Sequence, residues 1–183
     1  MVFFGMTASG KSTLGKAWAN HCRATYYNTD RVRKELAGLQ ASAKRPDGVG
    51  QGIYTTAFTE QTYQAMLDHA RRDFSQGRKL VVLDGSYGRR KDRDRVRSMA
   101  AAMGARCVFI FCTCPEEEVR RRLVLRSRDP EAVSDGRWEI YLHQQQMFEL
   151  PDEELEDDCI RLNTAQPVET LLQWLAAQPC GQG

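Results

Sequence analysis

The sequence has no long apolar run, because its hydrophobic stretches are all only a few residues long. A helix that crosses a bilayer needs about 20 mostly apolar residues, so the sequence predicts no membrane segment. The N-terminus also lacks a basic region followed by a long apolar stretch, and we therefore expect no secretory signal peptide. These absences predict a cytoplasmic protein.

A strong net charge is also missing, since 26 Lys and Arg face 24 Asp and Glu and leave a charge of +2. This balance argues against a surface dedicated to nucleic acid. The sign varies locally, with basic runs at 89–97 and 120–128 and an acidic run at 149–158. Charge runs usually form solvated helix faces, which is the interpretation that we favour for all three.

Metal-binding patterns are absent too: the three histidines are scattered, and the six cysteines lack the paired spacing of a zinc site. Cys112 and Cys114 alternate in an apolar stretch and would point to the same side of a strand. We interpret both as small buried hydrophobic side chains. The thiols are expected to be reduced.

Short apolar segments alternate with longer segments of helical periodicity along the whole chain. This alternation predicts an α/β fold with a mainly parallel sheet. We find no repeat or domain boundary, and we expect a single domain over 1–183 with a flexible tail at 178–183. Strands are expected at 2–4, 25–28, 80–83, 107–112 and 159–162, and helices at 11–21, 30–39, 59–76, 89–103, 116–127, 137–148 and 168–177.

The opening stretch MVFFGMTASGKS carries the pattern G-x-x-x-x-G-K-[ST] between a predicted strand and a predicted helix. Glycines let successive backbone N–H groups face phosphate oxygens, and the helix N-terminus adds its positive dipole end. Lys11 is expected to reach the β- and γ-phosphates of ATP, and the Ser12 hydroxyl to ligate Mg²⁺. The predicted phosphate-binding residues are Gly5, Thr7, Ala8, Ser9, Gly10, Lys11, Ser12 and Thr13.

Asp30 follows the second predicted strand, and Arg33 lies one helical turn later on the same face. An aspartate in this place can cap the helix, but the carboxyl edge of the sheet is also where ligands bind in open α/β folds. A carboxylate there can accept the proton of a hydroxyl that attacks the γ-phosphate, while an arginine holds the acceptor. The two interpretations are compatible.

Three further residues complete the predicted site. Asp84 ends the third predicted strand and is expected to help hold Mg²⁺. Arg122 and Arg126 are four residues apart and share a helix face. We expect both to act from a lid over about 122–137, where they would stabilise charge on the transferring phosphoryl group.

Five segments resemble the small P-loop kinases related to zeta toxin, gluconate kinase and polynucleotide 5′-hydroxyl kinase: GMTASGKS, TDRVRKELAG, GQGIYTTAFTEQTY, VVLDGSYGRRKDR and RRRLVLRSRDPEAVSDGRW. The chain more closely resembles the ATP-binding domain often fused to aminoglycoside-phosphotransferase-like domains. The resemblance covers 2–174 and implies a P-loop NTPase fold with a five-stranded parallel sheet of order 2-3-1-4-5. It also implies an aminoglycoside-phosphotransferase-like partner domain.

The same resemblance implies roles for single residues. Asp30 matches the acceptor-activating carboxylate and Arg33 the acceptor-phosphate arginine of the polynucleotide kinases, while Arg122 and Arg126 match lid arginines. Arg93 matches a recurring arginine whose role the sequence does not reveal. Where the phosphate loop of these kinases often reads P-G-S, this chain has Thr-Ala-Ser at 7–9. Phosphate binding is expected to survive the difference because these positions vary.

The leading functional hypothesis is an ATP- and Mg²⁺-dependent kinase that phosphorylates a hydroxyl of a small molecule, with the loop at 40–53 shaping the acceptor pocket. Tyr54 and Tyr63 flank that loop, and both suit core packing equally well. The segment 163–167 is expected near adenine. Two alternatives stay open. One is a polynucleotide 5′-hydroxyl kinase whose basic run at 89–97 tracks phosphates. The other is a non-catalytic ATP-binding regulatory module whose acidic run docks a partner.

Overall fold

The computed structural model describes residues 1–40, 51–128, 137–152 and 154–178. Five parallel strands form one sheet in the order β2-β3-β1-β4-β5, which confirms the predicted topology. The strands are β1 (Val2–Phe4), β2 (Thr25–Asn28), β3 (Val81–Gly85), β4 (Phe109–Thr113) and β5 (Cys159–Asn163).

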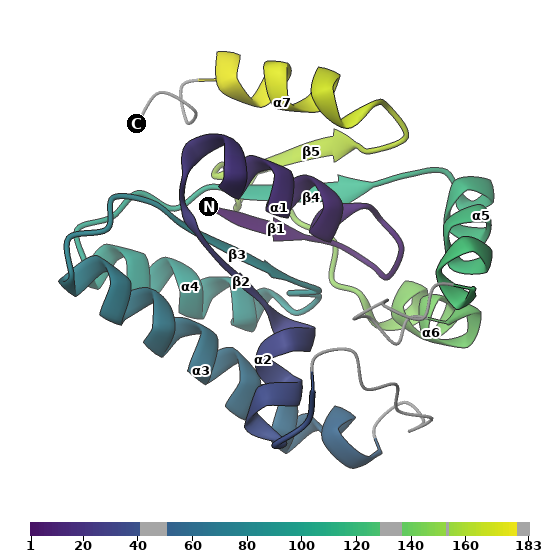
Figure 1. The fold of residues 1–183 in the computed structure, drawn as a ribbon, viewed down its shortest axis with the longest axis horizontal. Coiled ribbons are helices and arrows are strands. Elements are labelled where there is room, and N and C mark those ends of the chain that lie inside the picture. Colours follow the sequence, from purple (N-terminus) through teal and green to yellow (C-terminus); the bar gives the residue numbers. More distant parts are fainter. Residues whose placement is uncertain (41–50, 129–136, 153, 179–183) are drawn as a thin grey trace.

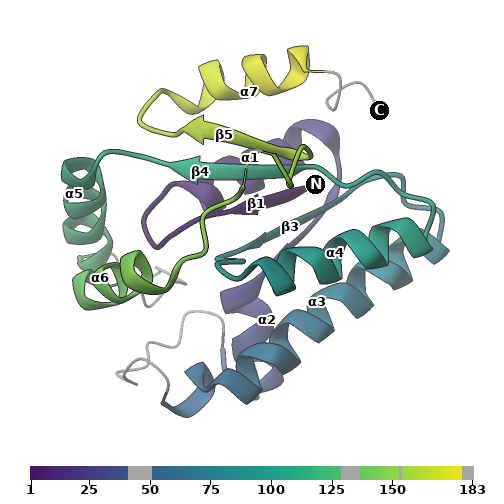
Figure 2. The same cartoon turned by 180° about the vertical axis from the view of Figure 1, so that it is seen from behind.

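Helices cover both faces of this sheet (Figure 1). One face carries α1 and α7, and the other carries α3 and α4, while α5 and α6 lie beyond the carboxyl ends of the strands (Figure 2). The helices are α1 (Lys11–Cys22), α2 (Thr29–Leu36), α3 (Thr56–Ser75), α4 (Arg90–Ala102), α5 (Glu116–Ser127), α6 (Trp138–Met147) and α7 (Val168–Ala177), with a short 3-10 turn η1 (Gly52–Tyr54).

Strand β1 shows how the sequence builds the two cores. Its three residues are all apolar and fully buried, as expected for a strand covered on both faces. Because side chains alternate along a strand, Phe3 packs with α1 and α7, whereas Phe4 packs with α3 and α4. Gly15 in α1 lets the helix approach closely, since a Cβ there would lie 3.2 Å from the Phe3 ring.

Two helices begin earlier than predicted, and the cap explains each start. Asn28 caps α2 by accepting a hydrogen bond from Arg31 N–H at 3.1 Å, so the interpretation of Asp30 as the cap is wrong. Thr55 caps α3 in the same way by accepting from Phe58 N–H at 3.3 Å. Helix α3 therefore starts at Thr56 rather than at residue 59.

The basic run at 89–97 and the acidic run at 149–158 bind each other. The buried Glu156 accepts hydrogen bonds from Arg93 Nε and Nη2, both at 2.7 Å, and from Arg97 Nη2 at 2.8 Å. The side chains of Arg93 and Glu156 are each only 1 % exposed. The interpretation of these two runs as solvated faces is therefore wrong at these positions.

Several predicted segments fall partly outside the described residues. The lid prediction covers the end of α5, which is described, and 129–136, which is not. Most of the loop at 40–53 and most of the tail at 178–183 are also outside. In the described ranges, no helix is long and apolar enough to pass through a bilayer.

Candidate active site

The phosphate loop between β1 and α1 alternates backbone conformations as an anion-binding nest does. Ala8 and Gly10 have positive φ angles of 58° and 83°. Leu14 N–H is the first in α1 to bond within the helix, to the carbonyl of Gly10 at 3.0 Å. The amides of Lys11, Ser12 and Thr13 therefore precede the helical ladder and belong to its orphan N-terminal donors. Such amides are suited to phosphate oxygens.

The opposite, carbonyl side of the loop is tied to the rest of the protein. Thr164 Oγ1 donates to the carbonyl of Ser9 at 2.6 Å. Arg122 Nη1 donates to the carbonyl of Ala8 at 3.3 Å, and its Nη2 donates to the carbonyl of Thr164 at 2.6 Å. Glu118 holds the same arginine at 2.7 Å. Arg122 thus lies in the outer wall of the loop, beside the segment predicted near adenine.

Gly10 lies next to the side chains of Arg122 and Thr164. A Cβ on this residue would lie 2.7 Å from both Arg122 Nη1 and Thr164 Oγ1, at a φ that L-residues rarely adopt. Gly10→Ala is expected to lower the free energy of unfolding by about 1–3 kcal/mol through strain and overpacking. Urea unfolding measures this loss. Gly38→Ala is the control, because its φ is +67° but no described atom lies within 4 Å of the added Cβ. A loss no larger than the control's would contradict the steric argument.

Lys11 lies among charged side chains that come from three other parts of the chain. Its Nζ donates to the carbonyl of Met6 at 3.1 Å. Burial lowers the pKa of Lys11, whereas the nearby carboxylates of Asp84 and Asp30 raise it and Arg126 lowers it further. Burial also lowers the pKa of Arg126, and Asp30 again acts in the opposite direction. The fold therefore brings together the predicted lysine, two predicted carboxylates and one predicted lid arginine.

Asp84 is fully buried at the end of the sheet, and only one of its two carboxylate oxygens is hydrogen-bonded within the described residues. Its Oδ2 accepts hydrogen bonds from the Tyr26 hydroxyl and from Asn28 Nδ2, both at 2.5 Å, whereas Oδ1 has no hydrogen-bond partner among the described residues. Burial raises the pKa of Asp84, while Lys11 and the hydroxyls of Tyr26 and Ser12 lower it. An unpaired carboxylate oxygen beside a serine hydroxyl is a donor set that suits Mg²⁺, so these residues fit the predicted ion.

Arg33 is engaged away from the phosphate loop. Its Nη1 donates to the carbonyl of Ile53 and to Thr59 Oγ1, each at 2.9 Å, and its guanidinium lies 5.0 Å from the centre of the Tyr54 ring. The residue is buried. Arg33 therefore joins α2 to η1 and α3 here, and its predicted contact with the acceptor remains a prediction. Asp30, in contrast, makes no hydrogen bond or ion pair with another described residue.

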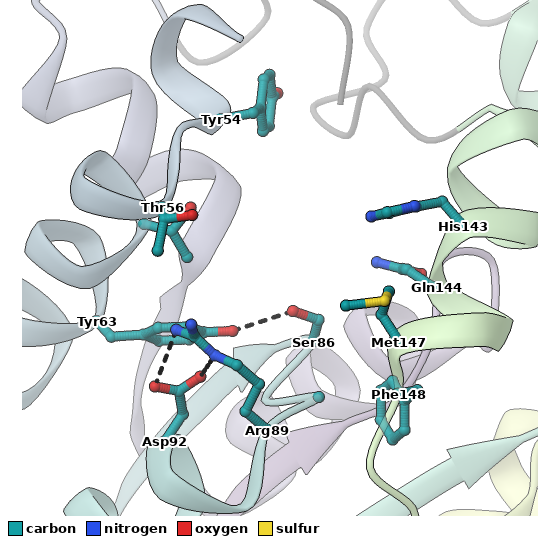
Figure 3. Close-up of a pocket in the computed structure, with 12 residues that line it drawn as sticks. Tyr54, Thr56, Tyr63, Ser86, Arg89, Asp92, His143, Gln144, Met147 and Phe148 are labelled. Carbon is teal, nitrogen blue, oxygen red and sulfur yellow. Dashed lines mark hydrogen bonds and ion pairs between the residues drawn. The ribbon is translucent and has the colours of Figure 1, made fainter. Parts of the chain in front are cut away.

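A cavity of about 270 Å³ opens between α3 and α6, next to the end of β3 (Figure 3). Tyr54 and Tyr63 enter it from one side, and His143 and Gln144 enter it from the other. Tyr63 is also 95 % buried, so it serves the core and the cavity together. The lining residues are Tyr54, Thr56, Thr59, Tyr63, Ser86, Gly88, Arg89, Asp92, His143, Gln144, Met147 and Phe148.

Gln144 connects this cavity to the phosphate loop. Its Oε1 accepts a hydrogen bond from Thr7 N–H at 2.6 Å across 137 residues of sequence. No pattern in the sequence predicts this contact. Tyr26 and Asn28 were also missed, although Asn28 pairs with Asp84 in the register of β2 and β3 and so shares its face.

A family model described as an AAA domain, AAA_33, matches residues 1–151. The chain belongs to this family. Uncharacterized proteins of Mycobacterium tuberculosis (strain H37Rv) and Mycobacterium bovis are each 30 % identical over 123 residues, which are 67 % of this chain and 24 % of theirs. The AAA_33 chain thus spans about a quarter of the length of these curated relatives.

Solved structures share the fold of this AAA_33 chain. A sugar kinase from Janibacter has a TM-score of 0.68 at 17 % identity and covers 96 % of this chain and 90 % of its own. A gluconokinase from Sinorhizobium meliloti has a TM-score of 0.61 at 21 % identity, and the match covers 94 % of this chain and 86 % of the gluconokinase. The APS kinase CysC of Mycobacterium tuberculosis, solved with AMPPNP and APS, has a TM-score of 0.64 at 18 % identity, and the match covers 95 % of this chain and 93 % of the APS kinase. The fold is therefore that of the P-loop kinases.

Proposed function

We propose that this AAA_33 protein is a kinase that transfers the γ-phosphoryl group of ATP to a hydroxyl of a small molecule. The observation that carries the proposal is the meeting of Asp30, Lys11 and Arg126 at the carboxyl edge of the sheet, with a cavity nearby. The shared fold of a sugar kinase, a gluconokinase and an APS kinase supports a small-molecule acceptor.

On the donor side, the orphan amides of 11–13 would receive the phosphates, and Lys11 would neutralise their charge. An APS kinase of the same fold binds AMPPNP, which supports ATP as the donor. Ser12 and Asp84 would hold Mg²⁺, which supplies further positive charge at the phosphate oxygens when it is bound. The contacts of Arg122 favour a role in holding the loop, whereas Arg126, which interacts electrostatically with Asp30, would act on the transferred group.

In the transfer itself, the acceptor oxygen attacks the γ-phosphorus and forms the new P–O bond. The bond from that phosphorus to the β,γ-bridging oxygen breaks, and ADP leaves with its electron pair. Asp30 accepts the proton of the attacking hydroxyl. Arg126 stabilises the charge that spreads over the transferring oxygens.

Acceptor-dependent ADP formation tests the proposal. The protein is incubated with ATP and Mg²⁺ and a panel of sugars, polyols, nucleosides and their acidic counterparts, and ADP is followed by a coupled assay. We expect at least one acceptor to raise the rate far above the ATP-only rate. Tight ATP binding with no acceptor-dependent turnover would instead favour the regulatory module.

The pairing of the basic run favours a small molecule over a polynucleotide end. Arg89, Arg93 and Arg97, which a nucleic-acid kinase would use along 89–97, are all paired with carboxylates of this chain. Binding through solvated cations would fall steeply with salt, and the paired arginines are poorly suited to it. The aminoglycoside-phosphotransferase-like partner domain stays a prediction, as do the single-domain organisation and the cytoplasmic location.

A further inference from the structure

The charges in the wall of the cavity neutralise each other. Apart from the imidazole of His143, the charged side chains among its described lining residues are Arg89 and Asp92. Arg89 Nε donates to Asp92 Oδ2 at 2.9 Å, and Nη2 donates to Oδ1 at 3.3 Å (Figure 3). The Asp92 side chain is 2 % exposed and that of Arg89 is 32 % exposed. The Arg89 guanidinium therefore lines the cavity with its charge already neutralised by the buried Asp92.

The cations next to the cavity are also engaged elsewhere. Lys91 pairs with Glu60 at 3.2 Å. Arg33 is not among the described lining residues, and its Nη1 donates to the carbonyl of Ile53 and to Thr59 Oγ1, which are uncharged partners. An anionic acceptor would therefore lose its hydration without gaining an unshared positive partner from the described wall, which is costly. An uncharged acceptor meets no such penalty.

The rest of the wall suits hydroxyl groups and C–H surfaces. The Tyr63 hydroxyl bonds Ser86 Oγ at 3.0 Å and accepts from Tyr87 N–H at 2.9 Å, which leaves Ser86 with spare hydrogen-bonding capacity. The rings of Tyr54 and Phe148 add apolar surface. A volume of about 270 Å³ is near the lower end of the range for small-molecule sites, about 300–1,000 Å³.

We infer that the acceptor is an uncharged polyhydroxyl compound of the sugar, polyol or nucleoside type, and that Asp92 sets this preference by neutralising Arg89. The inference rests on the kinase function proposed above. Asp92 is a specificity-determining residue in this account, because it acts on the acceptor only through the arginine.

The experiment arranges the acceptor panel in matched pairs. Each uncharged hydroxyl compound is compared with its carboxylate or phosphate counterpart, such as glucose with gluconate and adenosine with AMP, and kcat/KM is measured for both. The wild type is expected to prefer the uncharged member by about tenfold or more. Asp92→Asn keeps the shape of the side chain but frees the guanidinium, so the preference should move toward the acid by about tenfold.

Two further variants keep the test decisive. Asp94→Asn removes a half-exposed carboxylate of the same helix that lies outside this cavity, and it should leave the ratio unchanged. Arg89→Met removes the cation instead of freeing it, so its kcat/KM ratio should not move toward the acidic acceptors. This variant tests the role of Arg89 even if Asp92→Asn fails to fold.

The outcomes separate the two proposals. A wild type that prefers acids, or an Asp92→Asn protein that folds and keeps the wild-type ratio, would overturn the inference about the acceptor while the kinase function stands. No ADP from any pair would instead remove the kinase function, and this inference with it.

Discussion

Replacing Asp30 by asparagine is expected to lower the acceptor-dependent kcat by about 10²–10⁴-fold, which is the contribution of a well-placed general base. Asparagine keeps the size of the side chain but cannot take the proton of the attacking hydroxyl. Asp30 lies in the first turn of α2, close to Lys11 and Arg126, where the transfer would occur. The measurement is the coupled ADP assay at saturating acceptor.

Nucleotide binding separates a lost base from a damaged fold. The dissociation constant for AMPPNP with Mg²⁺, measured by calorimetry, should stay within about threefold of the wild type, because the loop amides are untouched. Glu35→Gln is the matched control, since Glu35 is an exposed carboxylate of the same helix. If Asp30→Asn turned over acceptor at the wild-type rate, Asp30 would not be the base.

Glu156→Ala should be the most destabilising of the substitutions considered. It removes the carboxylate that pairs with Arg93 and leaves a guanidinium that is 1 % exposed without a counter-ion. Breaking one side of a buried ion pair costs about 3–5 kcal/mol of unfolding free energy. Chemical denaturation measures it. Asp94→Asn, which removes a half-exposed partner of Arg97, should cost less than about 1 kcal/mol.

The same carboxylate predicts how stability depends on pH. Burial tends to raise the pKa of Glu156, but hydrogen bonds from Arg93 and Arg97 outweigh it and lower the pKa from 4.5 to about 2. Because the folded state holds the ionised form, this stabilisation is fully present above pH 4.5 and is lost as the pH falls toward 2. Glu156→Ala should therefore flatten the acid limb of the stability curve. A variant with an unchanged acid limb would contradict the assignment.

Removing both charges offers an independent check on the buried pair. An Arg93→Met and Glu156→Leu double variant should recover most of the loss, because apolar residues of similar volume often replace a buried ion pair without net cost. Arg93 Nη1 also donates to the carbonyls of Tyr87 and Glu149, at 3.0 and 3.1 Å. Incomplete recovery would therefore measure what these two backbone contacts contribute.

Much of the fold could be predicted because its signals are local. The alternation of apolar and helical segments predicts the α/β class, and the glycines before Lys11 predict the phosphate loop. Helix starts are harder to predict, because Asn28 and Asp30 are both good caps and only the backbone geometry of Asn28 decides between them. Propensity alone does not separate such neighbours.

A site residue could be predicted where its local motif indicates its role, as for Lys11 in the phosphate loop. It could not be predicted where the role of the side chain depends on a distant partner. Arg33, Arg93 and Arg122 look alike in sequence, yet each is held by partners that are far away along the chain, such as Glu156 at 63 residues from Arg93. The cavity could not be foreseen either, because its walls come from η1, α3, the β3–α4 turn and α6. Contacts of this kind depend on the register and packing of the whole sheet.

In the proposed kinase, the hydrogen bond between Thr7 N–H and Gln144 Oε1 would connect the nucleotide site with the acceptor cavity. A nucleotide that draws this amide toward its own oxygens releases the glutamine, and a molecule in the cavity that takes the glutamine releases the amide. Donor and acceptor affinities are then thermodynamically linked, and the factor by which one changes the other must be equal in both directions.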